Sequence, residues 1–424
     1  MPRLPEIVTA LAAVSGRGAC TDAERRACAL LRDRLRARGR PARLEPHWVR
    51  PQWPAAWAAH AALGVVGSLL SVLLPAVGLA VLAVTLVSYA LDLTGRAHLL
   101  RALFPRRATQ VVVSEPAGPH APVRLVIAAA VDAPRTGALF ADRYVRAEAR
   151  ARRTLRGHLS SPPAALAVLL LVLTALAGAR LAGAGGQALG AVQLVPTALL
   201  LIAGGGLIDI ALSSPSPGAN ADASAVAVAL ALAEALDAAP PRNLDVELVL
   251  AGAGDGRALG MRAYVGARRR ARRPEDVAVL ALGPCGAGRP RFHLTEGLLL
   301  PLRLHPRLIA LARRAAEAES HLCAAPAVRG LTAALPARTA RWPAIGISCL
   351  DAHDRPPHAR QRSDTPDNVE PAAIQAALEL CLALVAALDA DLQGVQAAST
   401  RGESVRSTPV GGAEERRRPL FFPR

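Results

Sequence analysis

Two long apolar blocks, residues 55–93 and 161–212, interrupt this chain of 424 residues. A helix that crosses a bilayer needs roughly 20 apolar residues, so each block is long enough for two crossings. Pro75 offers a turn in the first block, and the glycine-containing stretch 178–190 offers one in the second. Neither block shows the polar face that a surface helix of a soluble domain carries. We therefore expect four transmembrane helices in two hairpins; the alternative is buried helices within a soluble core.

The other pieces, 1–54, 94–160 and 213–394, have soluble character. Two crossings separate each piece from the next, so all three lie on one side of the membrane and can form one domain. Arginines flank the blocks on that side, whereas the two turns on the other side carry only Arg180; the flanking set is Arg50, Arg96, Arg101, Arg106, Arg107, Arg152, Arg153 and Arg156. The positive-inside rule then predicts an integral protein of the cell membrane, with the lipid bilayer as its partner and with the domain and both termini in the cytoplasm. We expect residues 395–424 to be a disordered tail.

The composition limits the remaining partners. The formal net charge is +17 and the chain contains no lysine, so arginine supplies the positive charge. Aromatic residues make up only 3% of the chain, and no aromatic and basic platform for single-stranded nucleic acid is visible. We therefore expect no nucleic acid partner. The six cysteines form no Cys-x-x-Cys pair, which argues against a zinc knuckle and against a redox motif.

Outside the two blocks, strand-like and helix-like segments alternate, which favours an α/β fold. Thr21 and Glu24 match a capping box at the start of the first predicted helix. The predicted strands are 41–49, 110–114, 123–130, 246–250, 277–282 and 344–348, and the predicted helices are 21–38, 142–156, 221–236, 259–267, 306–318 and 371–392. We expect a mixed, mostly parallel sheet with helices on both faces, interrupted by the two inserted helical hairpins.

Short polar motifs follow the predicted strands. The loop Ser216–Ser224 reads Ser-Pro-Gly-Ala-Asn-Ala-Asp-Ala-Ser and opens a helix, and the other motifs are Ala128–Asp132, Ala253–Gly256, Trp342–Ser348 and Ser363–Val369. In order and spacing these motifs resemble metallopeptidase family 28, the di-zinc aminopeptidases, whose fold the glutaminyl cyclases and the transferrin receptor ectodomain share. The resemblance covers the three soluble pieces and leaves out the apolar blocks.

The resemblance implies a site at the carboxyl ends of the strands, where two zinc ions hold the substrate and the attacking water. It implies two histidines, a bridging carboxylate, a glutamate and an aspartate as ligands, and a second glutamate as general base. At the ligand positions this chain has Ala130, Ala221, Asp255, Gly283 and Arg360, and at the base position it has Gly254. Because zinc needs three or four good donors, we expect no catalytic residue and no bound cofactor; zinc is the cofactor only in the alternative below.

Seven residues are candidates for the lining of the former cleft: Asp132, Asn220, Asp222, Asp255, His358, Arg360 and Asp364. We expect Arg360 and Asp255 to form an ion pair that replaces a metal. Asp222 lies one residue after the bridging position, and one step at a helix start turns a side chain by about 100°, so Asp222 is expected to cap the helix or face solvent. His358 offers a ligand only if the local register shifts.

The expected function is therefore binding of a ligand, peptide or protein partner by a catalytically inactive, membrane-embedded relative of the peptidases. The alternative is an active zinc aminopeptidase with an atypical metal site. Transport through the apolar helices is a third hypothesis, which the lack of an intramembrane charge pair disfavours. Ser216 and Ser224 lie in the loop, but no histidine and carboxylate are placed by the sequence to activate them.

Overall fold

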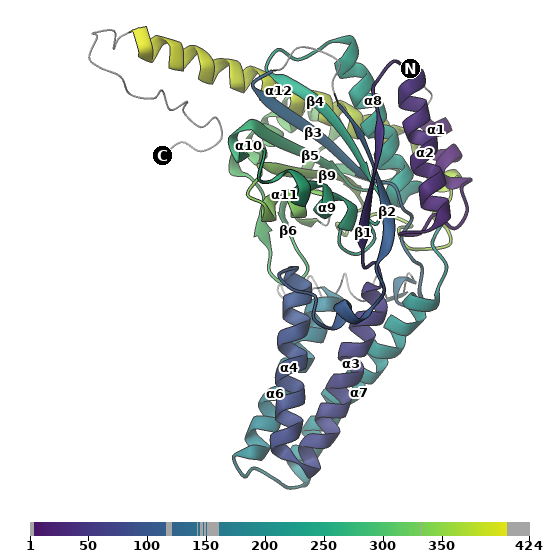
Figure 1. Ribbon diagram of the computed structural model, residues 1–424, viewed down its shortest axis with the longest axis vertical. Helices are drawn as coiled ribbons and strands as arrows, with labels where there is room; N and C mark the ends of the chain where they lie inside the picture. The colour runs from purple at the N-terminus through teal and green to yellow at the C-terminus, as the bar shows by residue number, and fades with distance from the viewer. Residues whose placement is uncertain are drawn as a thin grey trace.

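The computed structural model describes residues 4–115, 121–141, 143, 144, 147, 150, 161–330 and 332–404. Within them the chain forms a layered α/β domain and a bundle of long helices that extends from one end of the domain (Figure 1). Both apolar blocks contribute to this bundle, so two insertions that are far apart in the sequence lie side by side.

Nine strands of the described chain form one sheet, in the order β1-β2-β4-β3-β5-β9-β6-β7, with β8 paired to β6. Their bounds are β1 Arg43–Val49, β2 Arg107–Ser114, β3 Val123–Ala130, β4 Leu244–Ala251, β5 Val277–Leu282, β6 Arg289–Glu296, β7 Leu302–Arg303, β8 Ala325–Gly330 and β9 Ala344–Leu350. The central strands β4, β3, β5 and β9 run parallel; β1 and β2 pair antiparallel with their neighbours, and β6 is antiparallel to β9 and β7 but parallel to β8. The mixed, mostly parallel sheet is confirmed.

Helices cover both faces of the sheet, as expected. One face packs against α1 Leu4–Ala12, α2 Asp22–Ala37, α8 Ser224–Ala238, α10 Pro306–Ala318 and α12 Pro371–Ser404, and the other against α9 Leu259–Arg268 and α11 Ala334–Thr339. Side chains of β3 alternate between these cores: Leu125 and Ile127 enter the first, and Val126 and Ala128 enter the second. This two-residue period and the double burial explain why the central strands are almost wholly aliphatic.

The bundle consists of α3 Trp53–Leu73, α4 Pro75–Thr94, α6 Pro162–Leu181 and α7 Gln187–Leu212. Its outer surface is apolar: the side chains of Leu69, Leu201 and Ile202 are 61%, 67% and 68% exposed. Six described helices are long and apolar enough to cross a membrane by length and composition. Four of them form the bundle, whereas Ala219–Ala238 and Pro371–Gly394 pack on the sheet of the α/β domain.

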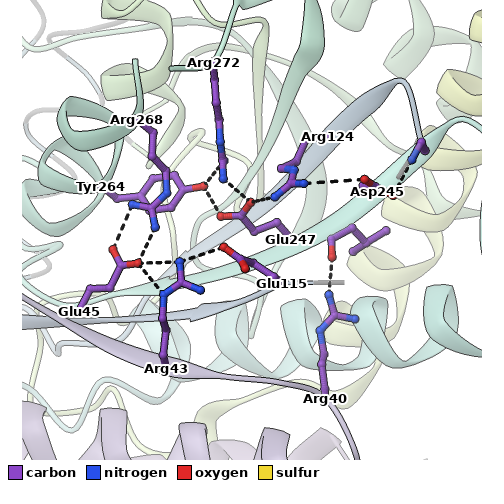
Figure 2. A network of polar contacts seen from close by, with 12 residues as sticks. Arg40, Arg43, Glu45, Glu115, Arg124, Asp245, Glu247, Tyr264, Arg268 and Arg272 are labelled. Atoms are coloured by element: carbon purple, nitrogen blue, oxygen red, sulfur yellow. Dashed lines mark hydrogen bonds and ion pairs between the residues drawn. The ribbon is translucent and has the colours of Figure 1, made fainter. Parts of the chain in front are cut away.

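A charged network lies near the amino ends of β3 and β4 (Figure 2). Glu247, which is fully buried, accepts from Arg272 at 2.9 Å and from Arg124 at 3.1 Å, and it also accepts the hydroxyl of Tyr264. Glu45 pairs with the side chain of Arg268 in the same network. Four arginines face four carboxylates here: Arg43, Arg124, Arg268 and Arg272 against Glu45, Glu115, Asp245 and Glu247. The charges of this end of the sheet are therefore balanced internally.

Several predicted boundaries differ from the observed ones. The Thr21 hydroxyl accepts from the amide of Glu24 at 3.2 Å, which confirms the helix cap. The Glu24 carboxylate does not complete the capping box at Thr21; it accepts from the amides of Cys20 and Ala253, each at 2.9 Å, because it is buried against the end of β4. α12 continues to Ser404, past the predicted boundary at residue 395, and the rest of the predicted tail and most of the predicted helix at 142–156 lie outside the described residues.

Candidate functional site

The candidate site lies where the parallel strands β3, β4 and β5 end. Asp132 follows β3, Gly254 and Asp255 follow β4, and Gly283 follows β5. The loop Ser216–Ser224 leads into α8 beside them through one wide π turn at Ala219–Ala223. Carboxyl ends of parallel strands meet at one edge of the sheet, so the fold brings together residues as far apart in the sequence as Asp132 and Gly283.

Asp132 joins the ends of β3 and β4. Its carboxylate accepts from the amide of Gly254 through Oδ1 and from the amide of Asp255 through Oδ2, the latter at 3.0 Å. Burial raises the pKa of Asp132 to about 7, and the nearby Glu24 contributes to the rise. Both oxygens of Asp132 accept from backbone amides. Asp132 therefore stabilises the loop after β4 and has little hydrogen-bonding capacity left for a ligand.

Arg360 and Asp255 form the expected ion pair, between Nη2 and Oδ1, which confirms that prediction. The Arg360 guanidinium lies 5.0 Å from the centre of the Phe140 ring and 5.5 Å from that of Trp53, within the range of cation–π attraction. The other oxygen of Asp255 accepts from the amide of Arg135 at 3.3 Å. Because Trp53 is the first residue of α3, the inserted bundle itself covers this part of the cleft.

Asn220 and Asp364 fix the shape of the loop Ser216–Ser224. Asp364 accepts from the amide of Asn220 at 2.6 Å and from that of Ala221 at 3.3 Å. The Asn220 side chain accepts from the amide of Gly286 at 2.6 Å and donates to the carbonyl of Pro357. Burial raises the pKa of Asp364 to about 6. Both residues therefore hold backbone together, and neither presents a free donor atom to a ligand.

Asp222 does not cap the helix, and it is half-buried. Its Oδ2 atom is buried without a hydrogen-bond partner, and burial, followed by the repulsion from Asp132, raises its pKa well above the usual range. Asp222 lies within the π turn at Ala219–Ala223, where the chain is wider than in an α-helix.

Arg17 is the nearest compensating charge, and the sequence prediction missed it. Its guanidinium donates to the carbonyl of Val131 at 2.9 Å and to those of Pro217 and Gly218 at 3.2 and 3.1 Å. The side chain is 1% exposed, and burial lowers its pKa while Asp222, Asp132 and Asp364 oppose that shift. The only sequence signal is the flanking pair Gly16 and Gly18, which marks a close backbone approach.

The cleft does not fit a pair of zinc ions. A Cβ atom placed on Gly254 would lie 2.5 Å from the Cβ of Ala130, and one placed on Gly283 would collide with the Ser348 hydroxyl. The backbone has therefore closed over two positions from which a base and a ligand would have to project. Arg360 carries positive charge at a third position. Among the described residues, no group of three or more His, Cys, Asp or Glu side chains is arranged to hold a metal.

His358 does not compensate for these changes. Its Nδ1 atom lies 3.1 Å from the Ser363 hydroxyl, and its backbone has a positive φ of 59°. Arg360 has a φ of 65°, so the loop holds two non-glycine residues in a conformation that is costly without support from its surroundings. This loop, together with Thr136–Ala141 and the end of α7, borders an open pocket of about 430 Å³ that Arg360 and Arg362 line.

A second buried polar cluster was not predicted. His293 on β6 lies 3.2 Å from Glu296, whose carboxylate also accepts from the amide and hydroxyl of Thr332. Gly346 on β9 makes room for them, because a Cβ there would lie within 3 Å of all three side chains. A single histidine in a strand gives no spacing signal, so the sequence could not indicate this contact.

Three comparisons with known proteins agree with this architecture. The chain matches the structure of a glutaminyl cyclase from Fimbriiglobus ruber with a TM-score of 0.51 at 13% identity, covering 91% of this chain and 96% of that one. A glutaminyl cyclase from Bacteroides thetaiotaomicron, bound to N-acetylhistamine, gives 0.52 at 13%, covering 90% and 96%. A zinc aminopeptidase from Bacillus subtilis gives 0.53 at 11%, covering 90% and 94%. At these identities the likeness shows the fold alone.

No curated protein matches the chain. The family model of peptidase family M28 matches residues 205–385, which begin inside α7 and end within α12. This segment includes the loop Ser216–Ser224, the ends of β4 and β5, and Arg360. The family match and the fold therefore lead to the same conclusion: this chain is a relative of peptidase family M28.

Proposed function

We propose that this chain is a membrane-anchored pseudopeptidase that binds a ligand or partner in the former catalytic cleft. The observation that carries the proposal is the ion pair between Arg360 and Asp255. It places a fixed cation on the one carboxylate that the family's ligand positions retain. A metal would have to displace that cation, and it would find only one of the three or four donors that a zinc site requires.

The membrane part of the proposal rests on the bundle. Its four helices have the length and the apolar outer surface that a bilayer requires, and they leave and re-enter the domain at one end. The excess of arginine at the domain end supports a cytoplasmic location of the domain and of both termini. At the opposite end, Arg180 donates to the side chain of Gln193 at 2.7 Å, which satisfies the only charge near that turn among the described residues.

The binding part rests on the pocket beside Arg360. Its volume of about 430 Å³ lies within the range of small-ligand sites. Arg362, Thr136 and Ser213 supply polar groups there, and Phe140 supplies an apolar surface. We propose a peptide or a protein segment as the occupant, because this mixture suits an extended chain with carbonyl and carboxylate groups.

The decisive experiment measures metal and activity on the full chain purified in detergent. Zinc content is determined by elemental analysis, and activity is assayed with aminoacyl anilides and with peptides that begin with glutamine, the reactions of the aminopeptidases and glutaminyl cyclases that share the fold. We expect substoichiometric zinc and no turnover above a heat-treated sample. Stoichiometric zinc with turnover that a chelator abolishes would establish the alternative, an atypical zinc aminopeptidase.

The topology is tested by labelling with a membrane-impermeant maleimide. Cys323 is exposed on the domain, and a cysteine introduced at Gly185, in the turn between α6 and α7, meets no other atoms within 4 Å. In right-side-out vesicles we expect label on Gly185→Cys in a Cys323→Ser background and none on Cys323 in the wild type. The reverse pattern would place the domain on the outer side, and labelling of both sites in sealed vesicles would refute the crossing of the bilayer.

A further inference from the structure

Three arginines meet where the bundle joins the α/β domain. Arg101 belongs to the short helix η1 Leu100–Leu103, which follows α4, whereas Arg257 precedes α9 and Arg262 lies in its first turn. We call this set the arginine junction. A Cβ atom placed on Gly95 would lie 2.7 Å from Arg257 and 2.9 Å from Arg262, so both guanidinium groups converge on the end of α4.

One carboxylate, that of Asp92, serves the arginine junction. Asp92 accepts from Arg101 at 2.6 Å and from Trp57 at 2.8 Å, and its other oxygen lies 2.7 Å from His98 Nδ1. Arg257 donates to the backbone carbonyl of Asp92. The carboxylate of Asp92 thus already accepts from Arg101 and Trp57 and contacts His98, and it does not balance the charges of Arg257 and Arg262.

The arginine junction keeps unused donors in a buried place. Arg101 is 1% exposed, and its Nε and Nη1 atoms have no hydrogen-bond partner; the Nε of Arg262 has none either. The carboxyl end of α4 adds about half a negative charge, which together with Asp92 still falls short of three guanidinium groups. A buried, unpaired donor of a charged group is costly, and arginine does not give up its proton. Among the described residues, Asp92 is therefore the only carboxylate that offsets the charge of these three guanidinium groups.

The surroundings indicate which anion fits. Leu99 and Leu103 flank Arg101 in the sequence and are 53% and 80% exposed, and Arg262 is partly exposed, so an exposed apolar surface adjoins the arginine junction. If the bundle crosses the bilayer, as proposed above, this surface lies at the level of the lipid headgroups. Guanidinium groups match the geometry of phosphate oxygens through paired hydrogen bonds.

We propose that the arginine junction binds a phosphate group, and that the phosphate is that of an anionic phospholipid at the membrane surface. This source rests on the proposed membrane insertion, whereas the phosphate chemistry rests on the arginine junction alone. The bound headgroup links η1, the end of α4 and the start of α9, and so fixes the α/β domain against the bilayer.

The test uses the full chain in a phosphate-free maltoside detergent, with binding followed by the shift in thermal unfolding. The probes are dioctanoyl phosphatidylglycerol, inorganic phosphate, and dioctanoylglycerol, which has the same acyl chains without phosphate. Arg262→Gln is the informative variant, because Arg262 is the partly exposed member of the arginine junction and its Nε has no hydrogen-bond partner among the described residues. Arg269→Gln, on the exposed end of the same helix, is the matched control.

We expect saturable binding of dioctanoyl phosphatidylglycerol, about tenfold weaker in Arg262→Gln and unchanged in Arg269→Gln, as expected for loss of one charge-assisted contact. Inorganic phosphate that binds as tightly as the lipid would overturn the lipid source. Equal binding of dioctanoylglycerol, or an undiminished affinity in Arg262→Gln, would overturn the phosphate site. Release of the chain from membranes without detergent would refute the proposed crossing. The measurement with inorganic phosphate would still show whether the arginine junction binds phosphate.

Discussion

The former cleft contains more acidic than basic side chains, whereas the arginine junction contains more basic than acidic ones. In the cleft, Asp132, Asp222, Asp255 and Asp364 outnumber Arg17 and Arg360. At the arginine junction, Arg101, Arg257 and Arg262 outnumber Asp92. In the network at the amino ends of β3 and β4, Arg43, Arg124, Arg268 and Arg272 face four carboxylates, and Arg40 beside them pairs with Asp237, so neither sign is in excess (Figure 2).

A buried excess of carboxyl groups can be neutralised by protonation, whereas a buried excess of guanidinium groups keeps its charge. Carboxyl groups lower an excess of negative charge by remaining protonated. Burial raises the pKa of Asp132 to about 7 and that of Asp364 to about 6. Burial lowers the pKa of Arg257 only to about 10, so this group stays charged at neutral pH. The cleft can therefore exist without an added ion, whereas the arginine junction requires an anion.

The largest effect is expected from Asp92→Asn. This change keeps the shape of the side chain and removes the one carboxylate beside three guanidinium groups, so we expect a loss of about 3–5 kcal/mol in the free energy of unfolding. Denaturant titration in detergent measures it. Asp367→Asn, at an exposed carboxylate in the loop before α12, is the control and should stay within about 0.5 kcal/mol. A loss as small as that of the control would mean that the arginine junction is not short of negative charge.

A smaller effect is expected in the cleft, from a double-mutant cycle on Arg360→Gln and Asp255→Asn. The side chains are 21% and 5% exposed, so their pairing should contribute a coupling free energy of about 1–3 kcal/mol. The pair Arg25 and Asp22 on α2 serves as the comparison, because its members are 61% and 63% exposed and should couple far more weakly. Equal coupling in both cycles would contradict the role of Arg360 as a replacement for metal.

The pH dependence of unfolding tests the excess of carboxyl groups in the cleft. Asp132 and Asp364 have pKa values above the ordinary value in the folded state, so the stability they contribute is complete below about pH 4 and is lost as the pH rises through about 6 and 7. We expect the thermal midpoint to fall between pH 5 and pH 8. Asp222→Asn should make the fall shallower, because it removes a carboxyl group whose own pKa burial raises well above the usual range. A midpoint that rises with pH over this range would contradict the carboxylate excess.

The smallest effect is expected from zinc. A metal that binds only the folded chain raises the thermal midpoint, and the cleft lacks the donors for such binding. We expect the midpoint to stay unchanged when zinc is added in excess and when a chelator is added. A zinc aminopeptidase with its complete ligand set is the positive control. A zinc-dependent rise in the midpoint that Asp255→Asn removes would show that the cleft still binds metal.

The sequence predicted those parts of the site that depend on which residue stands at a position. Losses at Ala130, Ala221, Gly254 and Gly283 are readable from spacing, and the pairing of Arg360 with Asp255 followed from opposite charges at neighbouring ligand positions. It missed β6, because Arg289–Glu296 mixes charged and polar residues with a proline and lacks the apolar run of a central strand.

Periodicity and composition are local properties, so the amino-acid sequence was enough to predict the alternation that builds the sheet and the two apolar insertions. Only the tertiary structure decided how the charges are distributed. Asp222 lies in the π turn with one carboxylate oxygen buried, and Arg17 donates to the loop Ser216–Ser224 from a distant part of the chain. Arg101 and Arg257 lie close together where the bundle joins the domain. These contacts join segments far apart in the chain, and their energy depends on burial, which only the packed structure defines.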